Sequence, residues 1–131
     1  MAAVNIKRSF LCDVKKVWDA VTSLENYLWR SDLDRIEILG EGRFIEHTKG
    51  GYATVFTVTA REPLKRYEFD MENENMSGHW TGLFSCADGK TTVDFTECVA
   101  AKKFWMKPFV KGYLKKQQAA YMVDLESMLT R

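Results

Sequence analysis

The sequence has few of the residues that staple small folds together or bind metals. It contains two histidines and three cysteines, Cys12, Cys86 and Cys98. An odd number of widely spaced cysteines is typical of free thiols in a reducing compartment. No HExxH, CxxC or carboxylate triad is present, and the glycine-rich turns are too short to form phosphate loops. We therefore expect neither a metal site nor a cofactor.

Long apolar runs and an excess of one charge are also missing. No stretch approaches the roughly 18 apolar residues of a membrane span. The first residues carry Lys7 and Arg8 without the apolar segment of a signal peptide behind them. Lys and Arg number 19 and Asp and Glu 18, so the net charge is +1. We expect a cytoplasmic protein with no nucleic-acid partner and no stable membrane insertion, and the balance gives no reason to expect binding to anionic membranes.

The chain is rich in aromatic residues, which make up 13% of its 131 residues. This length fits one domain over residues 1–131, and about two-thirds of the unfolded chain's surface can be buried at this size. Alternation over Val4–Phe10 predicts a first strand. Asp13 is a typical N-cap, and apolar residues at helical spacing follow it. A short second helix is predicted from Ser23 to Trp29.

Between Arg35 and about Ala101 the apolar residues alternate with a period of two, which predicts six antiparallel strands. Good hairpin turns lie at Glu41-Gly42, Gly50-Gly51 and Asp88-Gly89, with looser turns at Glu62-Pro63 and at residues 72–78.

The hairpin turns predict which residues face inward. The turn at Asp88-Gly89 pairs Phe84 with Val93, Gly82 with Phe95, and Trp80 with Glu97. The turns at Glu41-Gly42 and Gly50-Gly51 both place Ile45 and His47 on the inner face, and Tyr67, Phe69 and Met71 face inward on the next strand. One face of the sheet is therefore aromatic and the other mostly polar.

A long helix closes the chain. Pro108 suits its first turn, because a missing N–H costs little there, and the helical pattern runs to Leu129. A stripe at three- and four-residue steps marks one face: Phe109, Val110, Tyr113, Gln117, Ala120, Tyr121, Asp124 and Met128. A one-sided sheet and an amphipathic helix predict that the helix packs across the concave sheet.

This order of elements resembles the START-like, helix-grip superfamily, also called SRPBCC, which includes the birch-pollen-allergen fold and a polyketide cyclase/dehydrase-like branch. Asp13–Val21 is similar to the family's first-helix signature around a Val-Trp pair. Trp80 and the Gly89–Val93 segment resemble its penultimate hairpin. Phe10–Cys12 lacks the proline that the family often has there. The resemblance implies an α+β fold in which about seven curved strands (β-α-α-β6-α) wrap the last helix around a cavity.

Such cavities are mostly apolar, with a few polar groups that anchor the ligand. The residues that we expect to line the cavity and bind a ligand are Phe56, Tyr67, Phe69, Trp80, Phe84, Phe95, Glu97, Phe109, Tyr113 and Gln117. An ordinary solid core is the alternative. Gly82, facing Phe95, predicts a gap that a ligand or the last helix fills.

Two ionisable residues on the inner face are candidates for chemistry. Glu97 is predicted opposite Trp80, where it either anchors a ligand hydroxyl or acts as a general acid or base, or else reaches solvent at the strand's end. His47 would titrate near neutral pH in a pocket, but a lone inward histidine is more often a satisfied core residue. We expect His79 on the opposite face, so the two histidines cannot share a metal.

Three functions fit these residues. The first is a non-catalytic binding or carrier protein for an apolar or aromatic small molecule, such as a lipid or a polyketide-like compound. The second is an enzyme of the cyclase/dehydrase type that uses Glu97 or His47 for proton transfer. The third is a protein-interaction module, as in the chaperone co-activators of the superfamily. The sequence alone does not name the ligand or a protein partner.

Overall fold

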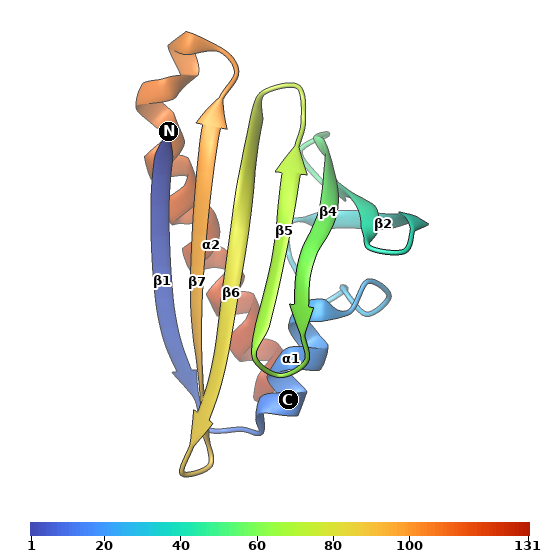
Figure 1. Cartoon of the computed structure of the whole chain (residues 1–131), viewed down its shortest axis with the longest axis vertical. Coiled ribbons are helices and arrows are strands. Elements are labelled where there is room, and N and C mark those ends of the chain that lie inside the picture. Colours follow the sequence, from blue (N-terminus) through green and yellow to red (C-terminus); the bar gives the residue numbers. More distant parts are fainter.

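The computed structural model describes residues 1–131 and consists of a seven-stranded antiparallel sheet and two helices (Figure 1). The elements in chain order are β1 (Ala2–Phe10), α1 (Val14–Thr22), β2 (Leu33–Gly40), β3 (Arg43–Thr48), β4 (Ala53–Glu62), β5 (Arg66–Glu72), β6 (Met76–Ala87), β7 (Lys90–Ala101), the single-turn η1 (Phe104–Met106) and α2 (Lys107–Leu129). The strands lie in the order β1-β7-β6-β5-β4-β3-β2. The predicted helix-grip architecture is confirmed.

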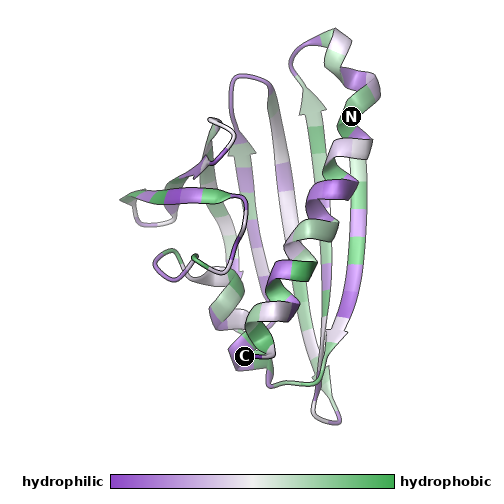
Figure 2. Cartoon of the chain, turned by 180° about the vertical axis from the view of Figure 1, so that it is seen from behind, coloured by the Kyte–Doolittle hydropathy of each residue, from purple (hydrophilic) through white to green (hydrophobic).

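The sheet curls strongly, so that β2 runs across the direction of β5, β6 and β7 in Figure 1. From behind, α2 crosses the concave face of the sheet diagonally (Figure 2). Helix α1 contacts β6, β7 and α2 and closes one end of the molecule. Neither helix has the length and apolarity that crossing a bilayer requires.

Helix α1 begins as predicted, but the predicted second helix is wrong. The Asp13 carboxylate accepts a hydrogen bond from the Lys15 N–H at 3.5 Å. The segment from Ser23 to Trp29 forms turns instead of a helix. The Ser23 hydroxyl caps a turn by accepting from the Asn26 N–H, and the Trp29 indole donates to the Asn26 carbonyl at 3.0 Å. This side-chain bond occupies a carbonyl that a continuing helix would need for its own backbone.

The hairpin of β6 and β7 has the predicted register. Its turn residues Asp88 and Gly89 have φ of 54° and 74°, as a tight hairpin turn requires. The pairs Phe84–Val93, Gly82–Phe95 and Trp80–Glu97 are all present. The inner face of this hairpin is therefore the predicted aromatic face.

The register predicted for β2, β3 and β4 is wrong by one residue at each of its two turns. A bulge between Ile38 and Gly40 adds a residue beside the Glu41-Gly42 turn. The next hairpin closes at Thr48 and Tyr52, which leaves a loop of three residues instead of two. Because side chains alternate with a period of two, a slip of one residue exchanges the two faces. Phe44 and Glu46 therefore face inward, and Ile45 and His47 face outward.

Helix α2 starts with Pro108 in its first turn and ends at Leu129, as predicted. Its buried side chains are Val110, Leu114, Gln118, Met122, Leu125 and Leu129. The predicted stripe does face the sheet side, because seven of its eight members line the cavity and Met128 packs against the core, but only Val110 belongs to the fully buried set. The flank that carries the predicted stripe faces a cavity, while the buried side chains pack on the sheet and on α1.

Gly82 makes room for the ring of Trp80, so the predicted gap is filled from within the same strand. A Cβ added at Gly82 would lie 2.4 Å from the Trp80 ring, with the Phe95 ring at 3.2 Å. The Trp80 ring in turn stacks on Phe69, with ring centroids 4.8 Å apart and planes 5° apart. Gly82 thus fixes the position of an aromatic wall.

The substitution Gly82→Ala is expected to destabilise the protein by about 1–3 kcal/mol, because the Trp80 ring must leave its place. Urea denaturation followed by circular dichroism measures this change. Gly40→Ala is the matched control, since a Cβ there meets nothing within 4 Å. Equal effects of the two substitutions would contradict the packing described for Trp80.

Candidate functional site

A cavity with two lobes lies between α2 and the inner face of the sheet. The inner lobe has a volume of about 160 Å³ and lies beside the core, where Trp29, Tyr67, Trp80 and Tyr121 line it. The outer lobe has a volume of about 270 Å³ and is lined by Tyr52, η1 and the first turns of α2. Both lobes share six lining residues: Asp32, Glu46, Phe56, Met71, Glu97 and Gln117. Together they reach the size of small-molecule pockets, roughly 300–1,000 Å³.

The structure places all but one of the predicted lining residues on this cavity. Those on the inner lobe are Tyr67, Phe69, Trp80 and Phe95, those on the outer lobe are Phe109 and Tyr113, and those on both are Phe56, Glu97 and Gln117. Phe84 is the exception. It packs in the core between Trp18 and Phe95, with ring centroids 5.0 and 5.8 Å away, so the prediction that it lines the cavity is wrong.

Glu97 lies on the inner face of β7 opposite Trp80, as predicted, at the junction of the two lobes. Its carboxyl group is half-buried and makes no hydrogen bond to another protein group. Desolvation, and secondarily the nearby Glu46 carboxylate, raise the pKa of Glu97 to about 7. A polar group that lacks a partner in the wall of an apolar cavity is available to a ligand.

The neighbouring acid, Glu46, has a cationic partner. Arg30, from the loop after α1, donates from Nη1 to Glu46 Oε2 at 2.8 Å and from Nη2 to Glu46 Oε1 at 3.2 Å. The same guanidinium group also donates to both carboxylate oxygens of Asp32, at 3.3 and 3.0 Å. The side chains of Arg30 and Glu46 are only 15% and 14% exposed. Burial disfavours the Arg30 cation, but Glu46 and Asp32 more than compensate and hold its pKa above its ordinary value.

Tyrosine hydroxyls add neutral polar groups to the walls. Burial is the largest cause that raises the pKa of Tyr67, Tyr113 and Tyr121. The Arg30 guanidinium carbon lies 5.2 Å from the centroid of the Tyr121 ring. These three residues therefore stay protonated at neutral pH and present O–H groups rather than charges.

Phe44, Glu46 and Arg30 are among the cavity residues that were not predicted from the sequence. The first two were missed because the predicted register of β3 was wrong by one residue, and Arg30 lies just after the segment that was wrongly predicted to be a helix. Phe44 and Glu46 alternate with outward residues along β3, and the sequence signal for them was present but was assigned to the wrong face. No pattern pointed to Arg30, because Glu46, the acid that it pairs with in β3, lies 16 residues away in the sequence. Asp124, at the cavity rim, accepts bonds from the Ser31 N–H and hydroxyl at 2.9 and 2.7 Å and so holds the Arg30 loop against α2.

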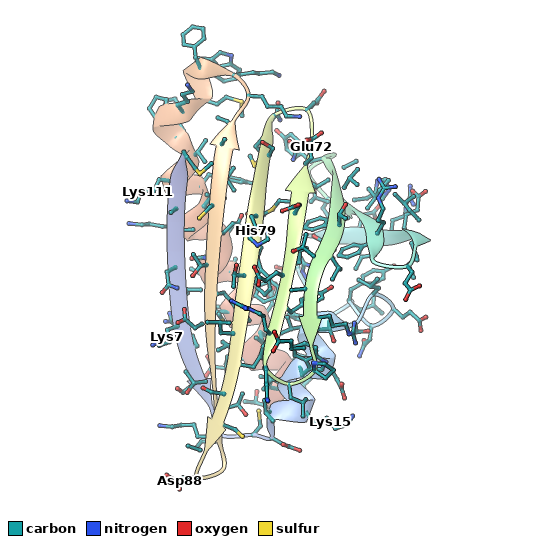
Figure 3. The ribbon with its side chains drawn as sticks, viewed as in Figure 1. Lys7, Lys15, Glu72, His79, Asp88 and Lys111 are labelled. Carbon is teal, nitrogen blue, oxygen red and sulfur yellow. The ribbon has the colours of Figure 1, made fainter.

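His47 lies on the outer face of the sheet, so its predicted inward orientation is wrong. Its Nε2 is 3.1 Å from Glu37 Oε1, and it does not line the cavity. His79 is also on the outer face, between Asp70 and Glu68 at 2.6 and 2.7 Å (Figure 3). The two histidines thus share a face, contrary to the prediction, but no group of three or more His, Cys, Asp or Glu residues is arranged to hold a metal ion.

Residues 1–127 match the model of a protein family described as polyketide cyclase / dehydrase and lipid transport. The chain belongs to this family. The predicted membership of the START-like superfamily is thereby confirmed. A search of curated protein sequences finds no match.

Solved structures show the same fold. A START superfamily protein from Mycobacterium smegmatis superposes with a TM-score of 0.86 at 12% identity, over 96% of this chain and 95% of the other. A conserved protein from Geobacillus kaustophilus has a TM-score of 0.83 at 12% identity, with coverage of 98% and 95%. The Aha1 dimer from Colwellia psychrerythraea gives 0.75 at 17% identity, with coverage of 96% and 94%. At these identities the likeness extends to the fold alone.

The position of Glu97 predicts a pH dependence of stability. Its pKa is raised in the folded state, so the folded chain holds a proton that the unfolded chain releases, and stability falls as the pH rises from about 4.5 to about 7. In Glu97→Gln this contribution is absent. We expect the variant to gain roughly 3 kcal/mol of unfolding free energy relative to the parent protein across this window.

Urea denaturation of both proteins at several pH values measures the difference, in which the contributions of all other titrating groups cancel. A difference that does not change with pH would show that Glu97 ionises equally easily in the folded and unfolded chains.

Proposed function

We propose that the chain binds an apolar small molecule, of lipid or polyketide-like kind, within the two-lobed cavity and holds its polar end against Glu97. The observation that carries this proposal is the half-buried Glu97 carboxyl group, which faces the cavity without a protein partner. Because no protein donor or acceptor occupies this group, a ligand hydroxyl or carbonyl in the cavity can pair with it.

The charges around Glu97 favour a neutral polar end. Glu46 lies close enough to raise the pKa of Glu97, and the Arg30 cation is already bonded to Glu46 and Asp32. An anionic headgroup would meet carboxylates without a free cation. A protonated Glu97 can donate to a ligand carbonyl, and an ionised Glu97 can accept from a ligand hydroxyl.

The shape of the walls favours a flat, ring-containing ligand. Phe44 and Phe56 stack with their planes 3° apart, and Phe69 and Trp80 stack with their planes 5° apart. All four residues line the inner lobe. Two stacked pairs of rings on one curved wall offer extended aromatic surfaces to an apolar partner.

A second candidate function is proton transfer on a bound ligand, as in a cyclase or dehydratase. One observation favours it: a pKa of Glu97 of about 7 suits a general acid or base at neutral pH. Glu97→Gln separates the two functions. An enzyme would lose turnover and keep its ligand, whereas a carrier would show no turnover in either form.

Filling the cavity should abolish binding. Ala119 and Ala120 are neighbours on α2 and are both exposed, but Ala120 lines the inner lobe whereas Ala119 lines neither lobe. We expect Ala120→Phe to weaken binding of the neutral fluorescent probe Nile red by at least tenfold, since the ring would occupy ligand space, while Ala119→Phe leaves it unchanged.

Fluorescence titration gives both affinities, and native mass spectrometry of freshly purified protein, with a solvent extract of the same sample, shows whether a natural ligand co-purifies. Nile red affinities that are the same in both variants and the parent protein would place the binding site outside the cavity and contradict the proposal.

A further inference from the structure

Three aromatic side chains stand in solvent at one end of the molecule. Phe104 and Trp105 in η1 and Phe109 in the first turn of α2 are 81%, 59% and 70% exposed. We call these three residues the aromatic rim. The other tryptophans, Trp18, Trp29 and Trp80, are all at least 91% buried, so Trp105 is exposed although the fold buries large rings elsewhere.

The segment that carries the aromatic rim is strongly basic. Residues 101–116 contain half of the chain's twelve lysines and no acidic residue, so this segment carries +6 while the remaining residues together carry −5. Lys102 pairs with Glu72 at 3.7 Å, and Lys103 donates to the Asn75 side chain at 3.1 Å. The other four lysines have no acidic partner within 4.0 Å. The near-neutral total charge therefore hides a local basic region.

The spacing of these lysines on α2 lowers the stability of the helix unless anions bind beside them. Lys107, Lys111 and Lys115 follow one another at four-residue steps along α2, with no acid between them. Like charges at this spacing lie one turn apart and destabilise a helix. An anionic surface would convert this repulsion into attraction.

We propose that this end of the molecule docks on the surface of a lipid bilayer that contains anionic phospholipids. The aromatic rim would enter the boundary between headgroups and acyl chains. The three lysines spaced along α2, at the same end of the molecule but on the other face of the helix from Phe109, would lie among anionic headgroups. Exposed Trp and Phe beside Lys are characteristic of segments that lie in a membrane interface. Basic residues near such a surface each contribute about 1 kcal/mol. Docking is peripheral and requires no membrane-spanning helix.

The cavity opens at the same end. Trp105 and Phe109 line the outer lobe together with Tyr113, which is 50% exposed. A docked molecule would therefore turn the mouth of the cavity toward the bilayer, so that an apolar ligand could pass between them without crossing water. This consequence rests on the proposed function, whereas docking itself does not require a ligand in the cavity.

The opposite end of the sheet supplies a matched control. Figure 3 shows Lys111 beside the end that carries η1, and Asp88 at the far tip of the β6–β7 hairpin. Lys65 lies in the β4–β5 turn, and Lys90 follows the Asp88-Gly89 turn. Both lysines are exposed and neither has an acidic partner. Reversing two lysines at either end changes the total charge equally.

The test measures binding of the full chain to phosphatidylcholine vesicles, with and without one-third phosphatidylserine, by co-sedimentation and by tryptophan emission, in which the contribution of Trp105 is the difference from Trp105→Phe. We expect binding only to the anionic vesicles, a blue shift of the emission, and release by high salt. Lys107→Glu/Lys111→Glu should weaken binding by about 25-fold or more, the product of roughly fivefold for each lysine lost. Lys65→Glu/Lys90→Glu should bind like the parent protein.

Several results would overturn the proposal. These are no binding to anionic vesicles at low salt, equal losses in the two double variants, or binding without a shift of the Trp105 emission. A shift that depends on protein concentration without vesicles, together with dimers in sedimentation, would instead assign the aromatic rim to contact between two copies. None of these measurements uses a cavity ligand. If membrane docking is contradicted, the proposed function is still tested separately by the Nile red titration of Ala120→Phe.

Discussion

The polar character of the cavity depends on the ion pair between Arg30 and Glu46. Two buried charges are expensive to desolvate, and only close geometry with further hydrogen bonds recovers that cost. Here the guanidinium group makes two bonds to Glu46 and two to Asp32, so the loop after α1 is tied to β3. Because Arg30 is bonded to these two acids and not to Glu97, Glu97 is left in the cavity wall without a cation. The polar character of the site follows from this distribution of partners.

The aromatic walls supply the other constraint. The absence of a side chain at Gly82 lets Trp80 fold over its own strand, and Phe69 stacks on it. The core around Trp18, Phe84 and Leu125 fills the end near α1, and a small cluster of Val4, Val99, Val110 and Leu114 fills the space between β1 and α2. The space between these two clusters, under the curled strands β2–β4, remains open. The curved sheet and α2 therefore enclose the two-lobed cavity.

The sequence determined the fold and one wall of the site more firmly than the other wall. Asp88-Gly89 is a two-residue turn with both residues at positive φ, so counting outward from it located Trp80, Phe95 and Glu97 correctly. Counting from the other two turns failed because one hairpin contains a bulge and the other has a longer loop. Both errors shifted the predicted register of β3 by one residue, so both placed His47 in the cavity instead of Glu46.

Helical periodicity has a similar limit. It marks an apolar flank but does not distinguish side chains that pack on the core from those that face a cavity, so Gln117 and Tyr113 were grouped with Val110. Total charge is equally uninformative about local charge. The +1 balance gave no sign that six lysines are gathered within residues 101–116, the segment that carries the aromatic rim.

The most direct measurement is an NMR titration of the protein with ¹³C-labelled glutamate side chains, with Glu97 assigned by comparison with Glu97→Gln. A midpoint for the Glu97 carboxyl carbon at about 7 is the expected result, because the group is desolvated, lies near Glu46 and has no cation of its own. A midpoint at about 4, the value of a solvated glutamate, would show that Glu97 is hydrated or paired and would remove the basis for a ligand anchor at this position.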